Sequence, residues 1–451
     1  MHTKDKQFEK MTNTPIPKLV SSLAIPTIIS MLITSIYNMA DTYFVSQLGT
    51  SASAATGIVF SLMAIIQAIA FAIGIGSGST ISRRLGEQNK EEADILGSSG
   101  FVTSLVFGFI LLVFGNIFIE PLMIILGSTE TILPYSISYA KYILFAAPFM
   151  ATSFILNNIL RAEGKANLAM VGISIGGIIN IILDPIFIFS FKLGISGAAI
   201  ATATSQFISF IILFSFYLRR KTIVQFSIKK ISRNINTYFI ILKNGMPSFF
   251  RQGLASIATV ALNFNAGNYG DSAVAAMSIV GRICMLIFCV VIGYGQGYQP
   301  VVGYNYGAKN YHRVKESFLF TLKVGTSIMT VLAIIGFILS PKIMSWFISD
   351  LEVIKIGTNA LRYQCLVMPL MTLGVLSNMT FQAVGKPLHA TFLTSCRQGI
   401  FFLPLIIILP KLFSLKGVEI TQPISDILTF IISIPFIYNF LKKLDYNNNA
   451  K

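Results

Sequence analysis

Two aspartates stand inside long apolar stretches of this sequence, each with a polar neighbour at helical spacing. Tyr37 precedes Asp41 by four residues, and Asn180 precedes Asp184 by four residues, so each pair shares one face of a helix. An ionisable side chain inside a membrane span is costly to bury and is a functional candidate by default. Two carboxylates with an amide and a phenol can carry a proton or bind a hard monovalent cation.

The spacing along the expected helices places these groups at one depth. Asp41 and Asp184 each come about seven residues before the end of an apolar run, and Thr202 comes about seven residues after the next run begins. At 1.5 Å per residue, all three lie roughly 10 Å below one membrane surface. We therefore predict a proton or Na⁺ site made by Asp41, Asn180, Asp184 and Thr202. The alternative is a pair of protonated, hydrogen-bonded aspartates that only tie helices together.

The second half of the sequence carries a different set of charges. Arg251, Arg282, Arg362 and Arg397 lie in or near apolar runs, and Asp426 is the candidate counter-ion. One interpretation is that Asp426 pairs with one arginine for structural reasons, and that Arg362 extends to the membrane surface. The sharper hypothesis is that some of these arginines face a cavity and recognise an anionic or zwitterionic substrate.

Membrane-spanning helices must position all of these residues. The chain has 451 residues, of which 54% are hydrophobic and 12% are charged, half the charged fraction of ordinary soluble domains. About 20 apolar residues cross a bilayer as a helix, and twelve runs of that kind follow one another. The length of each run favours helices over barrel strands. The predicted fold class is an all-α polytopic membrane protein with twelve transmembrane helices.

The basic residues predict how these helices are oriented. Of the 34 Lys and Arg residues, 22 fall at the termini and in the even-numbered connections between runs. Positive charge marks cytoplasmic loops, so both termini are predicted to be cytoplasmic. No basic face or aromatic platform indicates nucleic-acid binding. The residue usage, rich in Ile, Lys and Asn, points to a multi-pass protein of a bacterial inner membrane.

An internal repeat divides the chain at its midpoint. A shift of 221 residues superposes 26–89 on 247–310 with 16 identical pairs among 64 positions. Because each half has an even number of spans, the halves share one topology and form two pseudo-symmetric lobes with a site at or beside their interface. The acids do not repeat, since Asp41 aligns with Leu262. The glycines at 74–78 and 293–297 recur in both halves and are expected to allow close helix packing.

These observations divide the chain into five segments. We expect a cytoplasmic N-terminal segment (1–16), an N-terminal six-helix lobe (17–218), a basic cytoplasmic linker (219–236), a C-terminal six-helix lobe (237–441) and a cytoplasmic tail (442–451).

Four segments carry a family resemblance: YNMADTYFVSQLG at 37–49, RAEGK at 161–165, NIILDPIFIF at 180–189 and GISGAAIATATSQ at 194–206. They resemble the multidrug and toxic compound extrusion (MATE) family of efflux transporters, and the resemblance covers about 17–441. It implies a V-shaped cleft between two six-helix lobes. It also implies a bacterial branch whose coupling site lies in the N-terminal lobe, at Asp41 and Asp184 with Asn180 and Thr202. Further polar positions of that network match Tyr37, Tyr139 and Asn157.

We therefore expect a secondary active efflux antiporter that exports amphipathic, often cationic compounds in exchange for protons or Na⁺. No ATPase motif is present, so an ion gradient is the expected energy source. We expect no enzymatic activity, no cofactor, no structural metal and no nucleic-acid partner. The protein would act as a monomer in the lipid bilayer on small-molecule substrates. The alternative keeps the architecture but exports or flips an anionic or lipid-linked metabolite.

Overall fold

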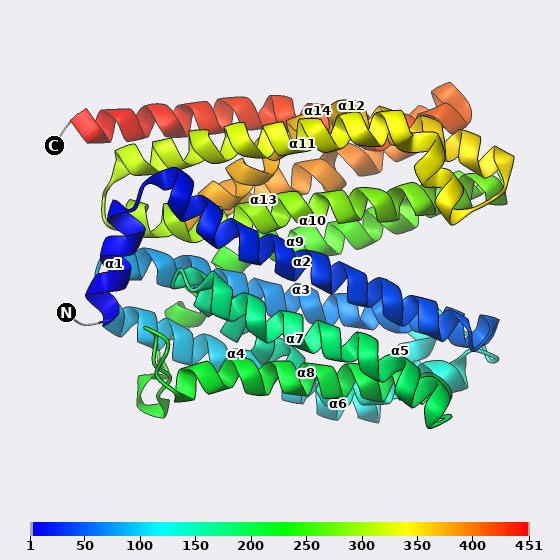
Figure 1. The fold of residues 1–451 in the computed structure, drawn as a ribbon, viewed down its shortest axis with the longest axis horizontal. Helices are drawn as coiled ribbons and strands as arrows, with labels where there is room; N and C mark the ends of the chain where they lie inside the picture. The colour runs from blue at the N-terminus through cyan, green and yellow to red at the C-terminus, as the bar shows by residue number, and fades with distance from the viewer. Residues whose placement is uncertain (1–2, 450–451) are drawn as a thin grey trace.

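The computed structural model describes residues 3–449, and the helices there form two bundles lying side by side (Figure 1). A short helix, α1 (Thr3–Asn13), precedes the first bundle. The first lobe contains α2 (Ile16–Ser46), α3 (Thr50–Gly86), α4 (Lys90–Ile117), α5 (Ile119–Ile125), α6 (Leu133–Ala162), α7 (Ala166–Pro185), a π-helical turn (Ile186–Ser190) and α8 (Gly194–Leu218). The second lobe contains α9 (Ile235–Gly267), α10 (Asp271–Gly307), α11 (Tyr311–Phe347), α12 (Leu351–Ala383), α13 (Pro387–Ser395), a π-helical turn (Cys396–Phe401) and α14 (Phe402–Asn449).

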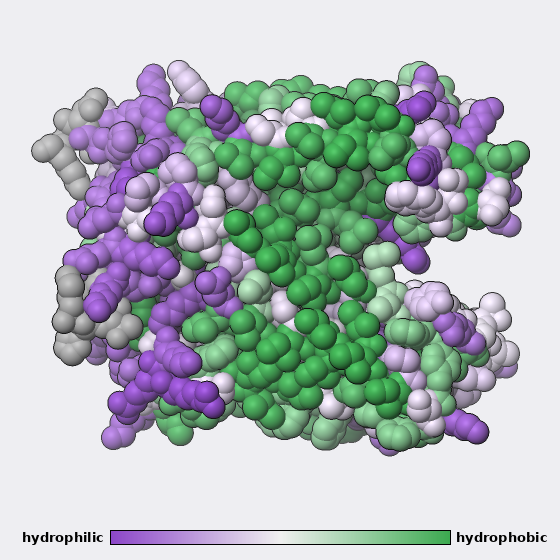
Figure 2. All heavy atoms as spheres, viewed as in Figure 1, coloured by the Kyte–Doolittle hydropathy of each residue, from purple (hydrophilic) through white to green (hydrophobic). Residues whose placement is uncertain are grey.

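The helices make twelve passes across the apolar band that Figure 2 shows through the middle of the molecule. Within residues 3–449, ten stretches are long and apolar enough to span a membrane. The last of them, Pro387–Tyr446, holds two passes, because Ser414 at φ 53° and ψ −138° interrupts α14. The remaining pass is α9, which carries Lys243 and Arg251 within its apolar stretch. The predicted fold class is confirmed.

The two lobes repeat one another at the offset of 221 residues. The bounds of α3 and α10 correspond residue for residue, and each helix has 37 residues. The turns agree as well: Gln88 and Lys309 both adopt left-handed backbone angles, with φ of 59° and 60°. Glycines precede α3 and α10 at equivalent positions with φ of 110° and 98°, a region that disfavours other residues.

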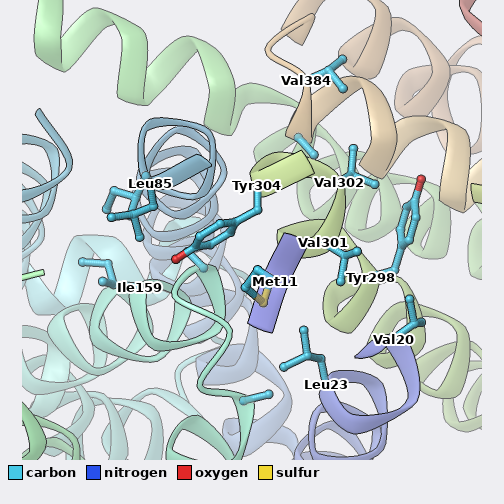
Figure 3. Packing of buried hydrophobic residues seen from close by; sticks show 14 of the residues in the cluster. Met11, Val20, Leu23, Leu85, Ile159, Tyr298, Val301, Val302, Tyr304 and Val384 are labelled. Atoms are coloured by element: carbon cyan, nitrogen blue, oxygen red, sulfur yellow. The ribbon is translucent and has the colours of Figure 1, made fainter. Parts of the chain in front are cut away.

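The apolar core shows where the lobes join. One buried cluster lies wholly within the first lobe, between Val45 and Ala199, and a second lies wholly within the second lobe, between Ala258 and Val418. The third cluster combines both lobes with α1, and Figure 3 shows Met11 packed near Tyr304 within it. Its residues come from the helix halves on the side of the chain termini. The lobes therefore share a core on that side and separate toward the opposite side, where Figure 2 shows a hollow between them.

Small residues bring the backbones of the two lobes together on the side of the termini. A Cβ atom added at Gly76 of α3 would overlap the backbone of α9, and one added at Gly245 of α9 would overlap the carbonyl group of Ala72 in α3. The repeat-related contact joins Gly297 of α10 to Ala24 of α2. We call these contacts the interlobe seam. They confirm the expected close packing of the repeated glycines.

Two segments outside the spans cover the same side. The α1 helix contacts both lobes, because Gln7 Nε2 donates to the carbonyl oxygen of Glu163 at 2.9 Å and Asn305 Nδ2 donates to the carbonyl oxygen of Met11 at 3.1 Å. At the other end of the described residues, α14 continues as helix to Asn449, within the segment that the sequence assigns to a cytoplasmic tail from 442.

The linker at 219–236 is bound to the first lobe. The Glu163 carboxylate accepts hydrogen bonds from the backbone N–H groups of Ile223 and Val224, both at 2.8 Å. The Asp94 carboxylate of α4 accepts from the N–H of Gln225 at 2.8 Å and forms an ion pair with Lys230 at 2.6 Å. These buried acceptors satisfy backbone donors that would otherwise lack partners.

Candidate functional site

Asp41 is buried near the end of α2 farther from the chain termini, with only 3% of its surface exposed. Its Oδ2 accepts a hydrogen bond from the Tyr139 hydroxyl of α6 at 3.1 Å. Its Oδ1 is buried and has no hydrogen-bond partner in the described chain. The carboxylate therefore keeps one free oxygen inside the first lobe.

Asp184 lies at the end of α7, where the helix gives way to Pro185 and the π-helical turn at 186–190. Asn180 Nδ2 donates to Asp184 Oδ1 at 3.3 Å and to Thr202 Oγ1 of α8 at 3.2 Å. Asp184 Oδ2 and Asn180 Oδ1 are buried without partners among residues 3–449. Proline and π-helical turns weaken the backbone ladder, and π-bulges are frequent at functional sites.

The two acids belong to one cluster. The charges of Asp41 and Asp184 are close enough to interact, and the Tyr139 hydroxyl interacts with both carboxylates and with Thr202. We call Asp41, Tyr139, Asn180, Asp184 and Thr202 the aspartate cluster. The sequence predicted Asp41, Asp184 and Thr202 from their common depth and Asn180 from its helical spacing to Asp184, and the structure brings the four residues together.

The two carboxylates of the aspartate cluster lack a positively charged partner among residues 3–449. A buried ionised carboxylate without a counter-ion is expensive, so the cluster favours protonation or a bound cation. No group of three or more His, Cys, Asp or Glu residues in the described chain could hold a metal. A cation would thus be held by two carboxylates together with amide and hydroxyl oxygens, the donor set of a hard monovalent ion.

A small cavity adjoins the cluster within the first lobe. Its volume is about 40 Å³, and Tyr37, Asn180, Thr202 and Gln206 line it. Such a volume holds a few water molecules, which would connect the unpartnered oxygens with the cavity. Sequence reasoning missed Gln206. The available signal was its spacing, four residues after Thr202 on the same face of α8.

Asn157 does not join the aspartate cluster. Its Nδ2 donates to the carbonyl oxygen of Ala169 at 2.9 Å, near the other end of α6. Asn378, its repeat mate, donates to the carbonyl oxygen of Ala390 at 2.6 Å in the second lobe. The equivalence of the two contacts shows that Asn157 ties α6 to α7, and in this structure it has no hydrogen bond to the aspartate cluster.

The second lobe pairs one of the predicted arginines with the predicted acid. Arg397 Nε donates to Asp426 Oδ1 at 2.7 Å, and the Gln364 side chain donates to Asp426 Oδ2 at 2.7 Å. Arg251 lines the same cavity as this pair. Arg282 is exposed on α10 and does not line that cavity, so the structure separates it from the group that the sequence suggested.

Two helical lobes related by a parallel repeat, with ionisable groups buried in the apolar band, form the architecture of a secondary transporter. The MatE family model matches residues 26–186 and 247–408, one stretch in each lobe at the same offset of 221 residues. The chain belongs to this family, which is a family of membrane transporters.

Relatives and solved structures agree over nearly the full length. Multidrug export protein MepA of Staphylococcus aureus is 27% identical over 436 residues, covering 96% of each chain. MepA of Staphylococcus haemolyticus is 27% identical over 442 residues, covering 98% of this chain and 97% of that protein.

Among solved structures, an outward-facing multidrug resistance MATE transporter has a TM-score of 0.93 at 28% identity, covering 98% of this chain and 99% of that chain. A Pyrococcus furiosus transporter described as having a binding pocket of reverse polarity has a TM-score of 0.92 at 28% identity, with the same coverage.

Proposed function

We propose that this protein is a secondary active multidrug efflux antiporter. It exports amphipathic, often cationic compounds in exchange for protons or Na⁺ by alternating access between the two lobes. The observation that carries the proposal is the aspartate cluster, in which two buried carboxylates each keep an oxygen without a partner. The full-length similarity to multidrug export proteins supports the drug-export part.

Coupling follows if the coupling ion and the drug bind the two conformations differently. Protonation or Na⁺ binding removes the cost of burying the charges of Asp41 and Asp184. The ion-loaded lobe can therefore adopt a conformation that is unfavourable for the ion-free lobe. Asn180 and Thr202 of the cluster line the adjoining cavity together with further residues of α2, α6, α7 and α8. A drug that binds better to the protein with charged aspartates would compete with the ion-loaded state and would be released when the ion enters.

We also propose that both termini face the cytoplasm. Both termini lie on one side of the molecule, and hydrophilic residues gather on that side (Figures 1 and 2). The excess of Lys and Arg in these connections favours a cytoplasmic location in a bacterial inner membrane. The hollow between the lobes then opens outward, and the interlobe seam closes the path to the cytoplasm.

The test is transport in proteoliposomes with an imposed proton or Na⁺ gradient and a fluorescent cationic dye. Asp41→Asn and Asp184→Asn should each abolish gradient-driven dye movement, and Asp271→Asn, at an exposed helix start, should leave it intact. The ion that drives wild-type transport identifies the coupling ion. Transport that survives in both Asn variants, with normal folding, would reduce the aspartates to structural residues and reject the mechanism.

A further inference from the structure

A second cavity lies in the second lobe, and its volume of about 80 Å³ is twice that of the cavity beside the aspartate cluster. It is lined by residues of α9, α10, α12, α13 and α14 and of the π-helical turn at 396–401. Apolar walls come from Phe288, Met371 and Phe430, and the charged groups are Arg251, Arg397 and Asp426. The cavity therefore combines apolar surface with an uneven set of charges.

The charge of Asp426 is already compensated. Its Oδ1 accepts from Arg397 Nε at 2.7 Å and from Gln422 Nε2 at 3.0 Å, and its Oδ2 accepts from Gln364 Nε2 at 2.7 Å. The Arg397 guanidinium also lies over the Phe288 ring, 4.5 Å from the centroid. Asp426 is thus buried, neutralised and hydrogen-bonded on both oxygens, as a stable buried pair requires.

Arg251 is the charge that remains. It lies near the middle of α9, is partly buried and has no ion pair or hydrogen bond to any residue between 3 and 449. A guanidinium carries five N–H donors and stays charged, so an unpaired one inside an apolar band is costly. With Arg397 and Asp426 cancelling, the cavity has an uncompensated charge of about +1.

We propose that the cavity of the second lobe binds the anionic group of an amphipathic ligand, with Arg251 as the residue that holds a carboxylate or phosphate. The planar guanidinium matches the two oxygens of either group, while Phe288 and Met371 contact the apolar body. The proposal rests on the transport function proposed above and adds amphipathic anions to the cationic compounds named there. The two lobes then divide the work, with cation uptake in the first and anion recognition in the second.

The ligand could be a soluble amphipathic anion or the headgroup of an anionic lipid, and the same test separates the two sources. Purified protein in nanodiscs of neutral phosphatidylcholine is titrated with pyrenebutyrate and, separately, with pyrenebutylammonium, which have the same apolar body and opposite charge. Empty nanodiscs provide the background. A second series contains phosphatidylglycerol, which should displace pyrenebutyrate only if a lipid headgroup occupies the site.

The wild type should bind pyrenebutyrate at least tenfold more tightly than pyrenebutylammonium. Arg251→Gln should weaken binding of the anion by roughly ten- to hundredfold, the usual range for losing a hydrogen bond to a charged group. Arg251→Lys, which keeps the charge without the planar fork, should retain part of the preference. The matched control is Arg362→Gln, because Arg362 belongs to the same lobe and donates to Ser340 Oγ at 3.0 Å outside the cavity.

Equal binding of the two probes by the wild type would overturn the proposal. So would unchanged anion binding in both Arg251→Gln and Arg251→Lys. If Arg251→Gln fails to fold, the Arg251→Lys variant and the preference of the wild type still decide the question. Binding of pyrenebutyrate in nanodiscs is measured without an ion gradient, so a failed gradient-driven transport assay and a failed anion site give different results.

Discussion

A single methyl group at the interlobe seam should shift the balance between the conformations of this transporter. Gly245 of α9 has the least room of the seam positions, because an added Cβ would overlap the carbonyl carbon and oxygen of Ala72. These are backbone atoms within α3, which cannot rotate away as a side chain can. The Gly245→Ala variant therefore strains only those conformations in which the lobes meet on the side of the termini.

The magnitude follows from the cost of overpacking. Extra methyl groups in a well-packed interior cost about 1–3 kcal/mol. Since about 1.4 kcal/mol corresponds to a factor of ten, the equilibrium should shift by roughly five- to 150-fold toward conformations with an open seam. The matched control is Gly253→Ala in the same helix, because a Cβ atom at Gly253 meets nothing within 4 Å.

Distances between spin labels can measure this shift. Glu91 and His312 are exposed, repeat-related positions at the starts of α4 and α11, so labels there report the separation of the lobes on the side of the termini. The four native cysteines, which are all free, are replaced first. Gly245→Ala should add or enlarge a long-distance population. The reasoning is refuted if the distance distribution does not change, or if Gly253→Ala changes it equally.

Three further predictions concern other contacts. Tyr139→Phe removes the hydroxyl that donates to Asp41 and should lower gradient-driven dye transport about tenfold at normal expression; unchanged transport would contradict its place in the cluster. Glu163→Ala leaves two buried N–H groups of the linker without hydrogen bonds and should destabilise the protein by about 2–6 kcal/mol. The unfolding temperature in detergent should fall for this variant and should not change for a surface substitution such as Asp271→Asn. Asn157→Ala and Asn378→Ala should lower the unfolding temperature by similar amounts while ion coupling persists; loss of coupling in Asn157→Ala alone would place Asn157 back in the network.

Depth along a helix could be predicted from the sequence, whereas the direction of a side chain often could not. Asp41, Asp184 and Thr202 lie at one depth because helical segments convert residue counts into height. Asn157 lies apart from the aspartate cluster because it follows Tyr139 by 18 residues, or about 27 Å of helix. Arg282 is exposed, and neither depth nor composition shows which face of α10 it occupies.

Helix ends were also hidden from the sequence. Hydropathy marks where a span leaves the apolar band, but α14 continues through polar residues to Asn449. For the interlobe contacts, the repeated glycines predict that helices pack closely. They do not predict which helix each glycine contacts, because that depends on how the two lobes meet. The linker likewise reads as a basic stretch, and its attachment to Glu163 requires the fold.

The attachment of the linker limits how far the lobes can separate. Hydrogen bonds hold its backbone to the first lobe as far as Ser232, whose N–H donates to Ser99 Oγ of α4 at 2.9 Å. The second lobe begins with α9 at Ile235, so the free chain between the lobes is only three residue steps, or about 11 Å when fully extended. The connection between Ser232 and Ile235 therefore limits the distance between α4 and the start of α9. While these bonds hold, the start of α9 stays beside α4, and the lobes can tilt about that corner but cannot slide apart.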